Sequence, residues 1–294
     1  MHESARALWL VRAGGATHHA PMRVGTVLLA TLGAMSLASV ARFDAKARPQ
    51  VLHVQAAASL AAPFTELARL FERRRPGVHV RLNSAGSQQL VAQIEQGARA
   101  DVLATADLQW MQRASERGLL ASPPVIFAHN RLALIVPRRN LARIERLSDL
   151  ARPGVKLVLG APSVPVGGYA RSFLARCTRD SSLGTAFERS VLANVVSEEE
   201  NVKAVFGKVQ LGEADAGIVY RSDLSGASSR HVREIAIPSH LNVTASFPIA
   251  ILARGGSSGA AQAFLDLLRS AEGRAVLERH GLQPAVDAGT GSAR

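Results

Sequence analysis

The chain has little of several residue types on which common classes of protein depend. It has one cysteine, Cys177, so no disulfide can form within the chain and no paired-cysteine metal site is expected. Only four of its 35 basic residues are lysines, and the arginines are scattered. No nucleic-acid-binding motif accompanies the formal charge of +12, so we expect no nucleic-acid partner. Aromatic residues are also scarce, so we expect the core to consist mostly of Ala, Val, Leu and Ile.

The chain also lacks the motifs of common enzymes. The stretch "AGSQQ", which ends at Gln89, does not match the G-x-S-x-G turn of serine hydrolases. The histidines occur in unrelated contexts, and no two of them have the spacing of zinc ligands. We therefore expect no catalytic site and no cofactor. Cys177 is predicted to be a small buried apolar residue.

No apolar run is as long as a membrane span. Residues 22–41 combine a positively charged start, an apolar stretch and small residues before a cleavage point, which is the layout of a secretory signal. The apolar stretch, Val24–Leu37, is shorter than the ~20 residues that a span needs. We predict that residues 1–41 are an upstream extension plus a signal peptide, with Met1 and Met22 both candidate starts. The mature protein is expected in the periplasm.

The rest of the chain alternates between strand-like and helix-like segments. In the first part, "VLHVQAA", "VHVRLNSA" and "DVLATAD" are predicted strands, and the segments between and after them have helical spacing of apolar residues. A second alternating series follows: "VKLVLGA", "GGYARSFLARC", "SVLANVV", "EENVKAVFGKVQLG" and "ADAGIVY". Within it, a helix is expected to begin at Ser197, with Glu198, Glu199 and Glu200 in its first turn. One last helix is predicted over residues 258–281. This order favours an α/β fold with parallel strands.

Two longer apolar segments, "NRLALIVPRRN" and "FPIAILARG", separate the two series. We predict two lobes, each a mostly parallel sheet flanked by helices, with these two crossing strands as the hinge. Lobe 1 would comprise residues 50–129 and 250–288, and lobe 2 residues 130–249. A ligand is expected between the lobes, at strand ends and helix starts.

Small polar residues lie where several predicted strands pass into helices. Ser59 follows the first strand, Ser84 and Ser87 follow the second, and a pair of glycines precedes a later helix. Each serine alone is typical of a helix N-cap. Helix starts also present unpaired N–H groups and a partial positive charge. If several of them meet in one cleft, they can hold an anion without lysine or arginine.

At these positions the chain resembles the periplasmic molybdate-binding proteins of ABC importers. The motifs, in order, are "AAASL", "AGSQQLVAQIEQGARADVLATAD", "VPVGGYA", "EENV" and "GIVYRSD", and the resemblance covers about Val51 to Leu282. It implies a type II periplasmic-binding-protein fold. It also implies that a tetrahedral dianion is bound between two lobes by hydroxyl and backbone N–H groups.

The resemblance also implies which residues bind the ligand. Ser59, Ser87 and Tyr220 would donate hydroxyl groups, with Ser84 a less favoured alternative to Ser87. Val166 and Val202 would donate backbone N–H groups. All five would contact the oxygen atoms of the oxyanion. They would bind the metal only through these oxygens and would not coordinate it directly. Val166 replaces a usual alanine and Asn201 a common aspartate, and neither change removes a donor.

These features predict an exported solute-binding protein that captures molybdate, and tungstate as well, and delivers it to an ABC permease in the inner membrane. It is expected to act as a monomer. One alternative is a binding protein for sulfate or another tetrahedral oxyanion, which would have a smaller cavity. An exported serine hydrolase and a DNA-binding regulator with a ligand-sensing domain fit the sequence less well. The hydrolase would need a nucleophile motif and the regulator a helix-turn-helix segment, and the sequence shows neither.

Overall fold

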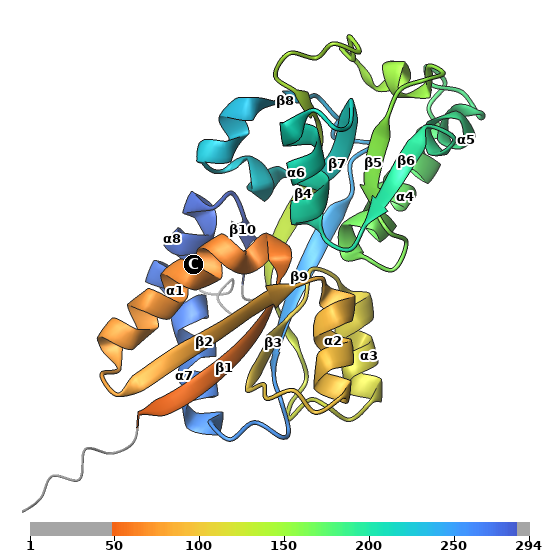
Figure 1. The fold of residues 1–294 in the computed structure, drawn as a ribbon. Helices are drawn as coiled ribbons and strands as arrows, with labels where there is room; N and C mark the ends of the chain where they lie inside the picture. Colours follow the sequence, from red (N-terminus) through yellow and green to blue (C-terminus); the bar gives the residue numbers. More distant parts are fainter. Residues whose placement is uncertain (1–48, 287–294) are drawn as a thin grey trace, which may run out of the picture. The chain divides into compact units, whose positions relative to one another are not determined.

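The structure is a computed structural model that describes residues 49–286, apart from the side chains of residues 227 and 228. The predicted extension and signal peptide, residues 1–41, lie outside this range. Within it, no helix is both long enough and apolar enough to cross a bilayer. The described residues form a mixed sheet with helices packed on it (Figure 1).

The first series of elements follows the predicted alternation of strands and helices. In chain order it comprises β1 (Gln50–Ala57), η1 (Ala58–Leu60), α1 (Ala61–Arg74), β2 (Val78–Ala85), α2 (Ser87–Glu95), β3 (Val102–Ala104) and α3 (Leu108–Glu116). β1 pairs in parallel with both β2 and β3. α1 buries Phe64, Leu67 and Phe71 against the sheet, because these residues share one face at helical spacing. α2 and α3 cover the opposite face (Figure 1).

The second series is built in the same way. In chain order it comprises η2 (Leu147–Ala151), β5 (Leu157–Gly160), α4 (Pro165–Cys177), α5 (Phe187–Leu192), β6 (Val195–Glu199), α6 (Val202–Leu211), β7 (Ala216–Tyr220), η3 (Arg221–Leu224), η4 (Ala227–His231) and β8 (Val232–Ile235). β5 pairs in parallel with β6 and β7. Cys177 is fully buried at the end of α4, as predicted, and burial raises the pKa of its thiol to about 12.

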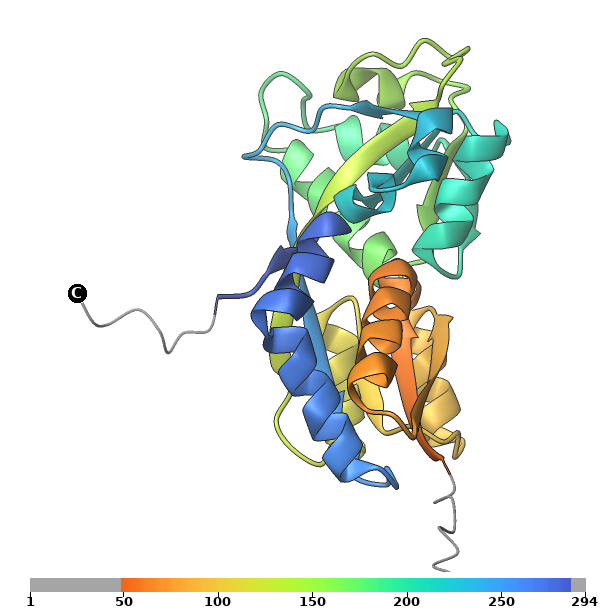
Figure 2. The same ribbon diagram turned by 90° about the vertical axis from the view of Figure 1, so that its left-hand side faces the viewer.

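Two long strands connect the series, as the sequence predicted. β4 (Val125–Pro137) pairs with β9 (Thr244–Ile251) along its first half and with β7 and β8 along its second half, always antiparallel. β9 also pairs with β3, and the chain then returns to the first series through α7 (Ser258–Arg269), α8 (Ala271–Arg279) and β10 (Gln283–Pro284). The strand order is β2-β1-β3-β9-β4-β7-β5-β6. Figure 2 shows β4 and β9 passing between the two groups of elements. The two-lobed α/β fold is therefore confirmed, and the exact lobe bounds stay a prediction.

The single C-terminal helix predicted over residues 258–281 is wrong, because Ser270 divides it into α7 and α8. Ser270 has an extended backbone, with ψ of 164°, and its Oγ accepts a hydrogen bond from the N–H of Gly273. The serine therefore ends one helix and caps the next. A Cβ at Gly273 would lie 2.1 Å from the carbonyl oxygen of Leu267, so the tight turn between the helices requires glycine.

The predicted helix start at Ser197 is also wrong. Parallel pairing with β5 continues as far as Glu199, so this segment is strand β6, and α6 begins at Val202. Glu198 and Glu199 are not first-turn acids; they pair with Arg171 and Lys208. Likewise, "SVLANVV" is not one strand, because its first residues complete helix α5.

Candidate functional site

A small cavity lies where elements of the two series meet. Its volume is about 20 Å³, far below the ~300–1,000 Å³ typical of sites for drug-sized ligands. The space suits one compact ion. The residues that line the cavity are Ala57, Ala58, Ser59, Gly86, Ser87, Ala106, Val164, Pro165, Val166, Asn201, Val202 and Tyr220.

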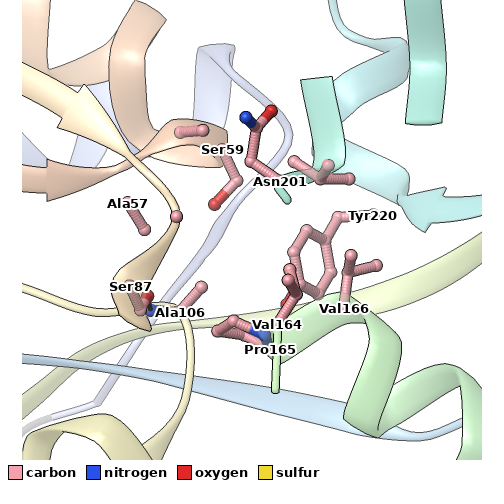
Figure 3. A pocket seen from close by; sticks show the side chains of 12 residues that line it. Ala57, Ser59, Ser87, Ala106, Val164, Pro165, Val166, Asn201 and Tyr220 are labelled. Atoms are coloured by element: carbon pink, nitrogen blue, oxygen red, sulfur yellow. Dashed lines mark hydrogen bonds between the residues drawn. The ribbon is translucent and has the colours of Figure 1, made fainter. Parts of the chain in front are cut away.

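All five predicted ligand residues line this one cavity. Ser59 and Ser87 come from the first series, and Val166, Val202 and Tyr220 from the second. Figure 3 shows the two serines on one side of the cavity and Val166 and Tyr220 on the other. Their role as ligands stays a prediction. Ser84, the less favoured alternative to Ser87, is exposed on β2 and does not line the cavity.

Two of these residues carry buried hydroxyl groups without a partner. Among the described side chains, the Oγ of Ser59 and the phenol oxygen of Tyr220 are buried and have no hydrogen-bond partner. The predicted N-cap role of Ser59 is wrong, because no side-chain hydrogen bond caps η1 or α1. A buried polar atom without a partner costs about 1–3 kcal/mol. This cost is removed if a ligand in the cavity accepts both hydroxyl hydrogens.

Ser87 also keeps a hydrogen to donate. Its Oγ accepts a hydrogen bond from the N–H of Ala106 at 3.1 Å, and the serine residue is only 1% exposed. A hydroxyl has two acceptor positions and one donor. The bond from Ala106 uses an acceptor position and orients the side chain, and it leaves the O–H hydrogen available to the cavity.

Two helices begin at the cavity and bring backbone donors to it. Val166 is the second residue of α4, after Pro165, and Val202 is the first residue of α6. N–H groups in a first helical turn have no acceptor within their own helix, and they carry the positive end of the helix dipole. The cap of α6 is Asn201, whose Oδ1 accepts from the N–H of Ala204 at 3.1 Å. Asn201 was not predicted from the sequence to line the cavity, although an asparagine directly before a helix is a recognisable cap.

The lining residues include no lysine, arginine, histidine or acidic residue. Burial raises the pKa of the Tyr220 phenol well above its ordinary value of 10.0, so the phenol stays protonated and remains a donor. Two carboxyl groups are close enough to act electrostatically on Tyr220: that of Asp107, at the start of α3, and that of Asp223, directly after β7. Burial raises the pKa of Asp107 to about 6, against a smaller opposing effect of the hydrogen bond from the N–H of Trp110. The donor set is therefore neutral and suits an ion that only accepts hydrogen bonds.

Direct hydrogen bonds join the two series beside the cavity. Gln88 and Gln89 of α2 donate to Glu200, the first to its carbonyl oxygen at 2.7 Å and the second to its carboxylate at 2.8 Å. The indole N–H of Trp110 donates to the carbonyl oxygen of Ser163 at 2.7 Å. We call these five residues the seam. The seam keeps the two halves in contact around the cavity, and none of its bonds was predicted from the sequence.

Comparisons with known proteins agree with this architecture. The family described as "Bacterial extracellular solute-binding protein" matches residues 52–283. The molybdate-binding protein ModA of Mycobacterium tuberculosis is 36% identical over 228 residues, which cover 78% of this chain and 82% of that protein.

Two solved structures share the fold. The periplasmic molybdate-binding protein of Azotobacter vinelandii superposes with a TM-score of 0.64 at 20% identity, covering 79% of this chain and 98% of that one. The sulfate-binding protein SubI of M. tuberculosis superposes with a TM-score of 0.71 at 18% identity, covering 81% and 88%. From the family match over most of the chain and the identity to ModA, we conclude that the chain belongs to the bacterial extracellular solute-binding proteins.

Proposed function

We propose that this protein is the solute-binding component of an ABC importer and that it captures molybdate in the cavity between its two lobes. The ligand residues would be Ser59, Ser87 and Tyr220 through their hydroxyl groups, and Val166 and Val202 through their backbone N–H groups. Tungstate has the same shape and charge and would bind in the same way. The protein would be exported to the periplasm by the signal peptide in residues 1–41, and would deliver the ion as a monomer to a permease in the inner membrane. It would perform no catalysis and need no cofactor.

One observation carries the proposal: the buried hydroxyls of Ser59 and Tyr220 lack partners, and both residues line the same small cavity. Molybdate is fully ionised at neutral pH and accepts hydrogen bonds only. A cage of O–H and N–H donors can satisfy all its oxygens without a counter-charge from the protein. Phosphate carries a proton near neutral pH, and the residues that line the cavity include no carboxylate to accept it. The identity to the molybdate-binding protein of M. tuberculosis supports the same ligand.

Sulfate is the second candidate, because the fold is also shared with a sulfate-binding protein. Sulfate is smaller than molybdate, so the same donors would form longer hydrogen bonds to it. We therefore expect molybdate and tungstate to bind much more tightly than sulfate or phosphate. Calorimetric titration of the mature protein with the four oxyanions separates these candidates. Sulfate binding as tight as molybdate binding would contradict the selectivity.

The ligand residues are tested by paired substitutions. Ser59→Ala and Tyr220→Phe each remove one hydroxyl donor and should weaken molybdate binding by about 1–3 kcal/mol. The matched controls are Ser84→Ala, at an exposed serine of β2, and Tyr169→Phe, at a tyrosine that does not line the cavity. Unchanged affinity in Ser59→Ala and Tyr220→Phe, or equal losses in the controls, would show that the assignment is wrong.

A further inference from the structure

A buried carboxylate connects two of the segments that line the cavity. Asp223 lies in η3, directly after β7, and its side chain is 0% exposed. Its Oδ2 accepts a hydrogen bond from the backbone N–H of Tyr220 at 3.0 Å. Its Oδ1 accepts from the Nζ of Lys203, the second residue of α6, at 2.8 Å. One carboxylate therefore contacts both the segment that carries the phenol and the helix that begins with Val202.

The position of this carboxylate is costly for folding and unfavourable for anion binding. Burial raises the pKa of the Asp223 carboxyl, and the ion pair with Lys203 offsets only part of that rise. The Lys203 side chain is 46% exposed, so solvent weakens its attraction for the buried carboxylate. A negative charge so close to an anion site also repels the ligand, unless a cation compensates it. The carboxylate nevertheless caps η3 through the N–H of Tyr220, and its pair with Lys203 adds a link to α6.

The ring contacts of Tyr220 do not duplicate the hydrogen bonds that Asp223 makes. The ring packs edge-on against Phe247, with centroids 5.4 Å apart, and against Tyr169, with centroids 6.4 Å apart. These contacts fix the plane of the ring. They provide no hydrogen bond to the backbone of Tyr220 and no link from β7 to α6. Asp223 provides both.

We infer that Asp223 is a positioning residue. It holds the end of β7 against the start of α6, so that the Tyr220 phenol and the Val202 N–H donate hydrogen bonds to the same oxyanion. Lys203 makes the link to α6 and cancels the charge of Asp223 near the ligand. This inference rests on the proposed function for its ligand, whereas the link between the two segments exists without any ligand.

The chain offers a matched control for the test. Asp149 occupies the equivalent position in η2, where its Oδ2 accepts from the backbone N–H of Arg146 at 3.1 Å and its Oδ1 lies 3.8 Å from the Nε of Arg146. It caps a turn and pairs with a cation, as Asp223 does, but η2 does not line the cavity. Asp149→Asn therefore reports the cost of weakening such a cap without disturbing the proposed ligand residues.

The first measurement is molybdate affinity by calorimetry. Asp223→Asn and Lys203→Met should each weaken binding about tenfold, as expected for one misplaced hydrogen bond to a charged ligand. In a Tyr220→Phe background, Asp223→Asn should weaken binding less than tenfold, because the part of its effect that acts through the phenol is already lost and only the part that acts through the Val202 N–H remains. Asp149→Asn should leave affinity unchanged. A full tenfold loss that persists in the Tyr220→Phe background, or an equal loss in Asp149→Asn, would overturn the inference.

The second measurement needs no ligand. The chain has two tyrosines, so protein labelled with 3-fluorotyrosine gives two ¹⁹F NMR signals, which Tyr169→Phe assigns. Asp223→Asn should shift or broaden the Tyr220 signal, and Asp149→Asn should leave both signals in place. An unchanged Tyr220 signal in Asp223→Asn overturns the inference. If the wild-type protein binds no oxyanion, the proposed function fails, and the fluorine signals still decide whether Asp223 positions Tyr220.

Discussion

Replacing Gly86 with alanine should prevent the two halves from closing around the ligand. Gly86 precedes α2 with φ of −61° and ψ of 143°, a conformation that alanine adopts without strain. A Cβ at this position would lie 2.5 Å from the backbone carbonyl oxygen of Glu200, which belongs to the second series of elements. It would also meet the side-chain amide of Gln88, which can move away. Glycine is therefore needed here for close approach and not for its backbone freedom.

The expected size of the effect follows from these distances. Ordinary contact begins near 3.4 Å, so the two backbones must separate by about 1 Å at this point. That shift stretches the hydrogen bonds from Gln88 and Gln89 to Glu200, which are worth about 0.5–1.5 kcal/mol each. Molybdate affinity should fall by about 1–3 kcal/mol. Thermal stability without ligand should fall slightly, because the weakened hydrogen bonds are offset only in part by the lower entropy of the unfolded chain with alanine.

The assay combines calorimetry with small-angle X-ray scattering. Wild-type protein should become more compact when it is saturated with molybdate, whereas Gly86→Ala should remain expanded and bind more weakly. The control is Gly259→Ala in α7, where an added Cβ meets nothing within 4 Å. Wild-type affinity together with wild-type compaction in Gly86→Ala would refute the reasoning.

Three further predictions concern Trp110, Asp107 and Cys177. Trp110→Phe removes the seam hydrogen bond to Ser163 and should weaken molybdate binding in calorimetry by about 1 kcal/mol; an unchanged affinity would mean that this bond does not support closure. Burial raises the pKa of Asp107 from 3.8 to about 6, so this residue makes the folded state less stable as pH rises from about 4 to about 6, and the loss persists above that range. Asp107→Asn keeps an N-cap at α3 and should raise the unfolding free energy at pH 7 by up to about 3 kcal/mol but not at pH 4, as measured by urea denaturation at both pH values. The Cys177 thiol should react with a thiol reagent only after urea unfolds the protein, because it is fully buried; fast labelling of the folded protein would contradict this.

Much of the fold could be predicted because its elements have clear periodicity. Strict alternation from Val78 to Leu82 predicted β2, and the helical spacing of Phe64, Leu67 and Phe71 predicted α1. The errors arose where local sequence supports two structures. The acidic run before α6 is compatible with a first helical turn, and only its pairing with β5 makes it a strand. Ser270 interrupts a segment whose apolar spacing continues through it.

The residues around the cavity could be predicted only in part. The resemblance to a known family placed Ser59, Ser87 and Tyr220, and the structure brings these three residues to one cavity. The link between Gln89 and Glu200 joins positions more than 100 residues apart, and no local pattern marks it. In the sequence, nothing distinguishes Asp223 from other acidic residues near turns. Its contact with Lys203 depends on how α6 packs beside β7, which a single sequence does not reveal.

The place of β9 in the sheet sets the order in which the protein can fold. β9 lies between β3 and β4, so the sheet that begins with β1 remains incomplete until residues near 250 are available. α7 and α8, which pack beside α1, come later still. Pairings between such distant parts of a chain form slowly. With the export proposed above, this late completion of the sheet would leave the newly made chain unfolded for longer, and an unfolded chain can be threaded through a translocation channel.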